Sequence, residues 1–197
     1  MIPLANFGDT VLRYEPLSKV LIWCGKMDID ADGSPNAYSP QDTGLDALRN
    51  AKDKEGNWCG IAVNSDTGHP YRQGEDGVGP AAGHFISTTA LQNPQFPVND
   101  TRRYVDSESV PFIVLPGHCP HAPCLGAKAL VVNIRNGKHA EAIYADIGPR
   151  NAIGEGSVAL ARLLGINDDA RGGGQSSDVL FIVYPLAVSS GAFEGYL

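Results

Sequence analysis

The sequence lacks long hydrophobic runs and an excess of positive charge. No stretch reaches the roughly 18 apolar residues of a membrane-spanning helix, so we expect no membrane partner. Its 15 Lys and Arg against 22 Asp and Glu give a formal net charge of −7. This balance argues against a nucleic-acid partner, because such binding depends on basic side chains that displace counterions. It is compatible with a cationic partner, although many soluble proteins are mildly acidic for solubility alone.

Cysteine is sparse, and no targeting segment is visible. The first residues show no basic segment followed by an apolar run, which a secretory signal would have. A mature secreted protein begun with a new Met would look the same. The four cysteines allow two disulfides or four free thiols, so they leave the redox compartment open. They are Cys24, Cys59, Cys119 and Cys124.

The chain of 197 residues is little longer than one typical domain of about 150 residues. We therefore predict a single domain over residues 1–197, and a monomer. The 23 Gly and 14 Pro exceed average usage but stay below the level of disordered low-complexity chains. We expect an ordered protein that is rich in turns.

Short apolar runs between turn residues indicate a mainly β protein. One convincing helical pattern covers 157–164 and ends at Gly165, and a weaker one covers 45–52. The turn-rich stretches 26–43 and 64–83 are long enough to be expected as binding surface. The predicted strands are 20–23, 61–63, 85–88, 112–115, 129–134, 142–145 and 179–184.

Two segments suggest metal binding, and each has a simpler interpretation. Residues 28–33 match the start of a calcium loop, but Ser39 stands where an EF-hand needs Glu. A capped turn, an irregular cation site or an acidic surface for a cationic ligand remain open. Residues 117–124 hold two Cys and two His at spacings unlike common zinc sites. A structural loop there is favoured over a metal site, and a Cys119–Cys124 disulfide is one way in which it could close.

Asp146 and Glu155 form the most informative pair. Asp146 ends an apolar strand, where burial would raise its pKa. Glu155 lies between two glycines before the predicted helix, where free amides would stabilise its charge and the glycines would admit a ligand. One protonated and one ionised carboxyl is what acid/base chemistry on one bond requires. The alternative is a tight turn at Asp146 and a simple helix cap at Glu155.

The sequence resembles the fungal-type chitosanases of glycoside hydrolase family 75. In that family the essential carboxylates are an Asp in an Ala-Asp-x-Gly segment and a Glu nine residues later in a Gly-Glu-x-Ser segment. Those positions are Asp146 and Glu155 here. The resemblance is carried by seven segments in order, which are 26–33, 85–91, 103–106, 110–116, 145–149, 153–161 and 178–185.

The resemblance implies an endo-acting, inverting hydrolase of β-1,4-linked glucosamine polymers that needs no cofactor and acts outside the cell. Asp146 is expected as the acid and Glu155 as the base. A polycationic substrate needs carboxylate subsites, and aromatic rings can stack on sugars. The expected substrate-binding residues are Asp28, Asp30, Asp32, Asp106 and Tyr104.

The sequence departs from the family in two places. Ala31 replaces a Cys that fungal members often have, and 117–124 looks like an insertion. For the fold we expect a single-domain, six-stranded, double-psi-like barrel with one or two short helices, with an α+β fold as the alternative. For the function, the alternatives are a non-catalytic polysaccharide-binding module on such a barrel and, last, a metal-dependent hydrolase.

Overall fold

The described part of the chain contains eight strands. The computed structural model describes residues 1–187, with 41% strand and 8% helix, which confirms a mainly β protein. The strands are β1 (Ile2–Phe7), β2 (Thr10–Glu15), β3 (Val20–Asp30), β4 (Phe112–Pro116), β5 (Ala127–Asn133), β6 (His139–Gly148), β7 (Glu155–Ser157) and β8 (Gln175–Ala187).

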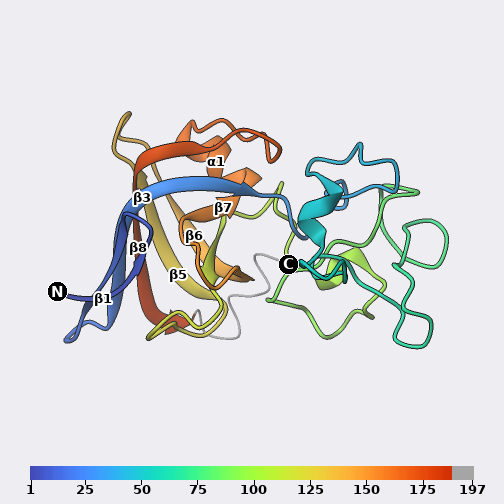
Figure 1. The fold of residues 1–197 in the computed structure, drawn as a ribbon, viewed down its shortest axis with the longest axis horizontal. Coiled ribbons are helices and arrows are strands. Elements are labelled where there is room, and N and C mark those ends of the chain that lie inside the picture. Colours follow the sequence, from blue (N-terminus) through green and yellow to red (C-terminus); the bar gives the residue numbers. More distant parts are fainter. Residues whose placement is uncertain (188–197) are drawn as a thin grey trace.

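Six of these strands close into a barrel, as predicted. Around it the order is β3-β7-β4-β6-β5-β8, and β8 pairs back onto β3. The pairs β3–β7 and β4–β6 are parallel, whereas the other pairs are antiparallel. The β1–β2 hairpin continues the sheet beyond β3, at the outer side of the barrel in Figure 1.

Alternation of side chains fills the barrel interior. Along β5, residues Ala127, Ala129 and Val131 are buried while their neighbours are more exposed, which is the two-residue period of a strand. Trp23 of β3 and Phe181 of β8 stack inside the barrel with ring centroids 4.6 Å apart. Both are buried, so their contact joins the two strands that close the barrel.

The predicted helix is present as α1 (Val158–Leu164). It begins after Ser157, whose hydroxyl accepts a hydrogen bond from the Leu160 N–H, and ends at Gly165 in the left-handed conformation with φ 64. The Ser157 hydroxyl also accepts from the Phe112 N–H at 3.0 Å and donates to the Val110 carbonyl at 2.9 Å. This one side chain therefore ties β7, β4 and α1 together.

A loop region, residues 31–111, separates β3 from β4 and lies beside one end of the barrel (Figure 1). It contains the 3-10 helices η1 (Leu48–Ala51) and η2 (Thr101–Arg103). The strands predicted at 61–63 and 85–88 were wrong, because these residues form only isolated bridges to single partners. The helix expected at 45–52 is reduced to η1.

No pattern in the sequence predicted β1, β2 or β7. Among the helices of the described chain, none combines the length and the apolar character needed to cross a membrane. A single domain over 1–197 stays a prediction.

Replacing Ser157 with Ala should destabilise the fold. The change removes a helix cap and leaves a buried N–H and a buried carbonyl without their partner, so we expect a loss of about 2–4 kcal/mol in the free energy of unfolding. Urea denaturation measures it. The exposed Ser176 provides the matched Ser176→Ala control, and equal stability of the two variants would contradict the assigned role of Ser157.

Candidate active site

Strand register brings Asp146 and Glu155 to the same place. In β4, Val114 is the register partner of Glu155 on β7 and of Asp146 on β6. The two acids thus lie two strands apart, a backbone separation of about 9–10 Å. On the other side of β7, Glu155 pairs with Asp28 of β3. Asp28, Glu155, Val114 and Asp146 therefore form a row across four strands.

This row faces away from the barrel interior. Met27 and Ile29 of β3, like Ile113 and Leu115 of β4, belong to the interior core, so the residues that alternate with them point outward. The outward side is covered by the loop region, and between the two lies a cleft of about 1510 Å³. Its walls come from the end of β3, from residues 46–60, 88–92 and 146–150, and from residues 169–173.

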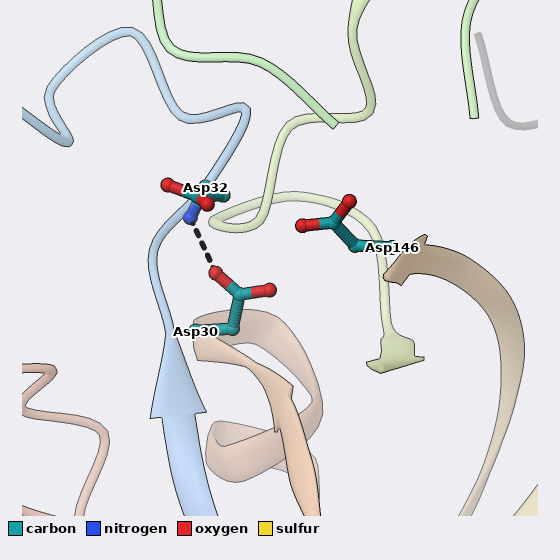
Figure 2. Close-up of side chains that lie close together, drawn as sticks. All are labelled: Asp30, Asp32 and Asp146. Carbon is teal, nitrogen blue, oxygen red and sulfur yellow. Dashed lines mark hydrogen bonds between the residues drawn. The ribbon is translucent and has the colours of Figure 1, made fainter. Parts of the chain in front are cut away.

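Three carboxyl groups gather at the centre of this cleft. Asp30, Asp32 and Asp146 each place one carboxylate oxygen within 4.8 Å of the others (Figure 2). The Asp32 N–H donates to Asp30 Oδ1 at 2.7 Å, and the Ala90 N–H donates to Asp146 Oδ1 at 2.7 Å. The Ser87 hydroxyl lies 3.3 Å from Asp32 Oδ1. Backbone donors therefore hold two of the three groups in place.

Burial and mutual repulsion raise the pKa of all the central carboxyls. For Asp30 and Asp32, desolvation is the largest cause, followed by neighbouring aspartates. Desolvation also raises the pKa of Asp146, although the N–H groups of Ala90 and Ile147 oppose the shift. For Glu155, desolvation and the charges of Asp30 and Asp28 raise the pKa, while Lys26 opposes them.

The expected environment of Glu155 was wrong. The helix cap is Ser157, and Glu155 is a strand residue whose pKa is raised by burial, so the helix does not keep it ionised. The flanking glycines also do not admit a ligand. A Cβ on Gly154 would collide with the Lys26 carbonyl, and one on Gly156 would lie 2.9 Å from Met27 Cε and Leu160 Cδ2. Their small size lets β7 pack closely against the protein itself.

Comparison with known proteins gives the family. The protein-family model described as fungal chitosanase of glycosyl hydrolase group 75 matches residues 27–191. The chain belongs to this family. A search of the curated proteins found no match. Membership confirms the resemblance seen in the sequence and makes the chain a glycoside hydrolase. The matched range starts within β3 and leaves out the β1–β2 hairpin.

The structure sorts the substrate-binding residues expected for a chitosanase. Asp28, Asp30 and Asp32 all line the cleft, with Asp28 exposed and paired with Lys26. Tyr104 and Asp106 do not line it. The Tyr104 side chain is buried against Ala62 and Ile86 and donates its hydroxyl to the Val98 carbonyl.

Asp106 fixes a turn. Its Oδ1 accepts the Glu108 N–H and its Oδ2 accepts the Ser109 hydroxyl. The expectation that Tyr104 and Asp106 bind sugar is corrected accordingly. Of the two stretches expected as binding surface, 26–43 contributes to the cleft, and 64–83 contributes none of its lining.

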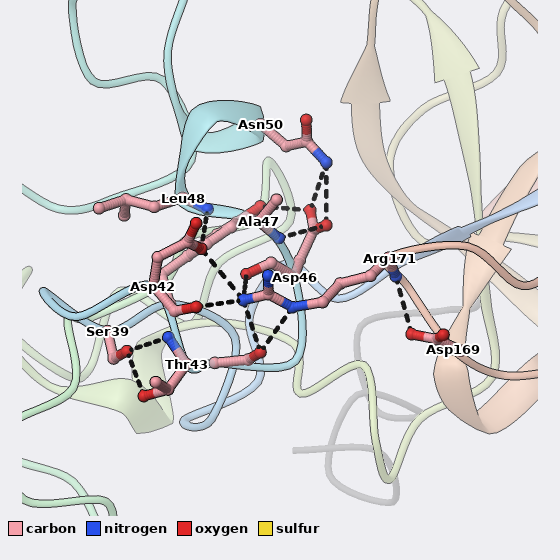
Figure 3. Close-up of polar contacts among 11 residues, drawn as sticks. Ser39, Asp42, Thr43, Asp46, Ala47, Leu48, Asn50, Asp169 and Arg171 are labelled. Carbon is pink, nitrogen blue, oxygen red and sulfur yellow. Dashed lines mark hydrogen bonds and ion pairs between the residues drawn. The ribbon is translucent and has the colours of Figure 1, made fainter.

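Sequence reasoning missed a polar network at the far wall of the cleft (Figure 3). The Arg171 guanidinium donates to the carbonyls of Asp42, Gly44 and Asp46 at 2.8–3.0 Å and pairs with Asp42 Oδ1 at 3.0 Å. The Asp46 carboxylate accepts hydrogen bonds from Asn50. This network fastens residues 169–173 to the loop region. No local sequence signal predicts it, since the partners are more than 120 positions apart.

The Cys and His segment 117–124 forms neither a disulfide nor a metal cluster among the described residues. All four cysteines are free, so the Cys119–Cys124 bond is absent. His121 instead stacks on Tyr14 with ring centroids 4.4 Å apart. The one group of possible metal ligands in the described part of the chain is the three aspartates of the cleft. No helices flank 28–33, in agreement with the rejection of an EF-hand.

Neutralising Asp30 should stabilise the protein at high pH. The pKa of Asp30 is raised in the folded state, so the folded protein binds this proton more tightly than the unfolded chain. Proton binding therefore stabilises the fold at low pH, and the stabilisation is lost as pH rises through the folded-state pKa of Asp30. Asp30→Asn keeps an acceptor for the Asp32 N–H and removes the charge. We expect a gain of about 1–3 kcal/mol at about pH 8 that vanishes by about pH 4. Thermal and urea unfolding across this pH range measure it.

Asp53→Asn is the matched control. Hydrogen bonds from Asn57 lower the pKa of Asp53, so its charged form is already favoured in the folded state, and neutralisation should give no gain at about pH 8. A stability gain from Asp30→Asn that did not change with pH would contradict the electrostatic account of the cleft.

Proposed function

We propose that this protein is an endo-acting chitosanase that hydrolyses β-1,4-glucosaminide bonds with inversion, using Asp146 and Glu155. The family supports the choice of reaction. The observation that carries the proposal is the shared register partner Val114, which sets the two acids on opposite sides of one strand, in one cleft. The sequence positions of Asp146 and Glu155 alone do not require their side chains to lie in one cleft.

The spacing suits an inverting reaction. Such enzymes hold their two carboxyl groups roughly 6.5–9.5 Å apart to leave room for a water molecule. Backbones two strands apart, about 9–10 Å, with both side chains directed to the same cleft are compatible with that separation. The base takes a proton from water, the water oxygen attacks the anomeric carbon, and the acid protonates the leaving oxygen as the glycosidic bond breaks.

The surroundings favour Glu155 as the acid and Asp146 as the base, the reverse of the division expected from sequence. Asp146 accepts a 2.7 Å hydrogen bond from the Ala90 N–H, which stabilises its ionised form. Among the described residues, Glu155 receives no such bond, and Asp30 and Asp28 raise its pKa further. Before the glycosidic bond breaks, Glu155 is therefore more readily protonated than Asp146, as a general acid must be.

The central aspartates suit a protonated amine. An ammonium group offers three donors, and Asp30, Asp32 and Asp146 offer three oxygens within 4.8 Å of one another. Calcium takes six to eight oxygen ligands, which three carboxylates reach only when each uses both oxygens or when water is added. An arriving ammonium would also lower the raised pKa of these carboxyls, because an opposite charge favours their ionised form. We therefore propose that the cluster binds the amine of a glucosamine unit.

Both catalytic carboxylates should be essential for chain cleavage. Asp146→Asn and Glu155→Gln should each lower reducing-end release from fully deacetylated chitosan about 10²–10⁴-fold, the usual contribution of an acid or base. Asp106→Asn, outside the cleft, is the control and should keep its activity. NMR of the first product formed should show the α-anomer.

Several outcomes would count against the assignment. Normal turnover by Glu155→Gln would remove the pair from the mechanism. Binding of chitosan without new reducing ends would indicate a non-catalytic polysaccharide-binding module. Parallel assays on carboxymethyl cellulose and chitin test the substrate, and activity on cellulose alone would replace chitosan as the substrate while leaving the reaction type unchanged.

Substrate binding should release protons. At about pH 5.5 the amine is charged and carboxyls with raised pKa values still hold protons, so an ammonium entering the cluster should displace them. Titration calorimetry of a glucosamine oligomer into Glu155→Gln, in two buffers of different ionisation enthalpy, measures this release. Adding Asp32→Asn should reduce it, and heats that were equal in both buffers would contradict the proposal.

A further inference from the structure

A second hollow adjoins the cleft beside β3. This distal hollow has a volume of about 590 Å³ and is lined by residues of β3 and by residues 165–167 and 173–176, together with Arg135. Asp28 and Gly173 line both the cleft and the hollow. The two spaces therefore adjoin each other at these two residues.

The local charge changes along β3, which lines both spaces. Lys26, Asp28 and Asp30 occupy alternate positions of β3, so their side chains share one face of the sheet. Asp30 lines the cleft, Asp28 lines both spaces, and Lys26 lines the hollow. A ligand that follows this face passes from a carboxylate cluster to the neutral Lys26–Asp28 ion pair.

The distal hollow is unsuited to an ammonium group. Its charged lining consists of Lys26, Arg135 and Asp28. Asp28 pairs with Lys26, and Arg135 pairs with Asp178 at 2.9 Å. Among the described lining residues there is thus no carboxylate without a cationic neighbour, whereas the cleft gathers three carboxyls. An amine placed here would find no unpaired carboxylate to balance its charge, which favours an uncharged group over it.

The hollow does offer amide groups with free hydrogen-bonding capacity. Asn167 Oδ1 accepts the Asp169 N–H, and the Nδ2 group makes no hydrogen bond to a described residue. Gln175 donates through Nε2 to Asn133 and to the Ser177 carbonyl, which leaves its Oε1 as an acceptor. An acetamido group carries one carbonyl acceptor and one N–H donor, and these two lining side chains offer one donor and one acceptor of the matching kinds.

We propose that the distal hollow is a subsite for an N-acetylated sugar of the same chain whose charged sugars occupy the cleft. The proposal rests on the proposed function and adds the substrate class to it. The enzyme then cuts partly acetylated chitosan at a fixed distance from an acetylated unit. Asn167 is the specificity-determining residue, because its side chain donates to the acetyl carbonyl.

Product sequencing tests this arrangement. Partly acetylated chitosan is digested in ¹⁸O-labelled water, which marks each new reducing end, and mass spectrometry reads the acetylation at every position from the cut. Wild type should show one position enriched in acetylated units relative to the polymer. Asn167→Asp should reduce this enrichment about fivefold, the ratio expected for one lost hydrogen bond, because a carboxylate replaces the donor and attracts ammonium.

Asn6→Asp is the matched control, since Asn6 is exposed on β1 and lines neither space. It should keep the wild-type pattern. Equal acetylation at every position in wild-type products, or equal enrichment in the two variants, would overturn the subsite. If Asn167→Asp failed to fold, the wild-type pattern alone would decide. Absence of cleavage of any chitosan by wild type would instead reject the proposed function, and the subsite with it.

Discussion

The pairing of the short strand β7 with both β3 and β4 is the contact on which the site depends. In the sheet order β3 and β4 are joined through β7, so closing the barrel and placing Glu155 are one event. Close packing makes this possible: Gly154 has a φ of 90 and lies against the Lys26 carbonyl, and Gly156 lies over Met27 and Leu160. A larger residue at either position would move Glu155 away from Val114.

The site is built at an electrostatic cost that the barrel offsets. The cleft brings together four carboxyl groups with raised pKa values, those of Asp30, Asp32, Asp146 and Glu155. The folded protein is therefore more stable when some of these groups are protonated than when all four are charged. The interior beneath them is apolar, with Trp23 stacked on Phe181. Such a division, with stability in the barrel and repulsion in the cleft, is common where activity requires an otherwise unfavourable arrangement.

Sequence reasoning found the features that are local in the chain. The helix with its stop at Gly165, the mainly β character and the pair Asp146 and Glu155 all have signals within a few residues, whereas the helix cap was expected at Glu155 and lies at Ser157. The rest depends on long-range contacts. A three-residue strand with a central glycine has no periodicity to detect, and the apolar runs 61–63 and 85–88 resemble strands but find only single bridges. The Arg171 network joins segments that are remote in sequence. The burial of Glu155, which raises its pKa, likewise depends on the distant loop region that covers this face of the sheet.

The net charge of −7 takes on a more specific meaning once it is located. A total charge governs solubility and long-range attraction, and it cannot position a polymer that carries the same ammonium on successive sugars. Position requires a local change in charge, and β3 supplies one, because Asp30 belongs to the carboxyl cluster whereas Asp28, on the same face, is neutralised by Lys26. A chain sliding along that face would gain attraction at one end and lose it at the other. Even a uniform polycation would then be bound in one preferred position along the cleft. An acetylated sugar in the distal hollow would add a second feature that fixes the register of the bound chain.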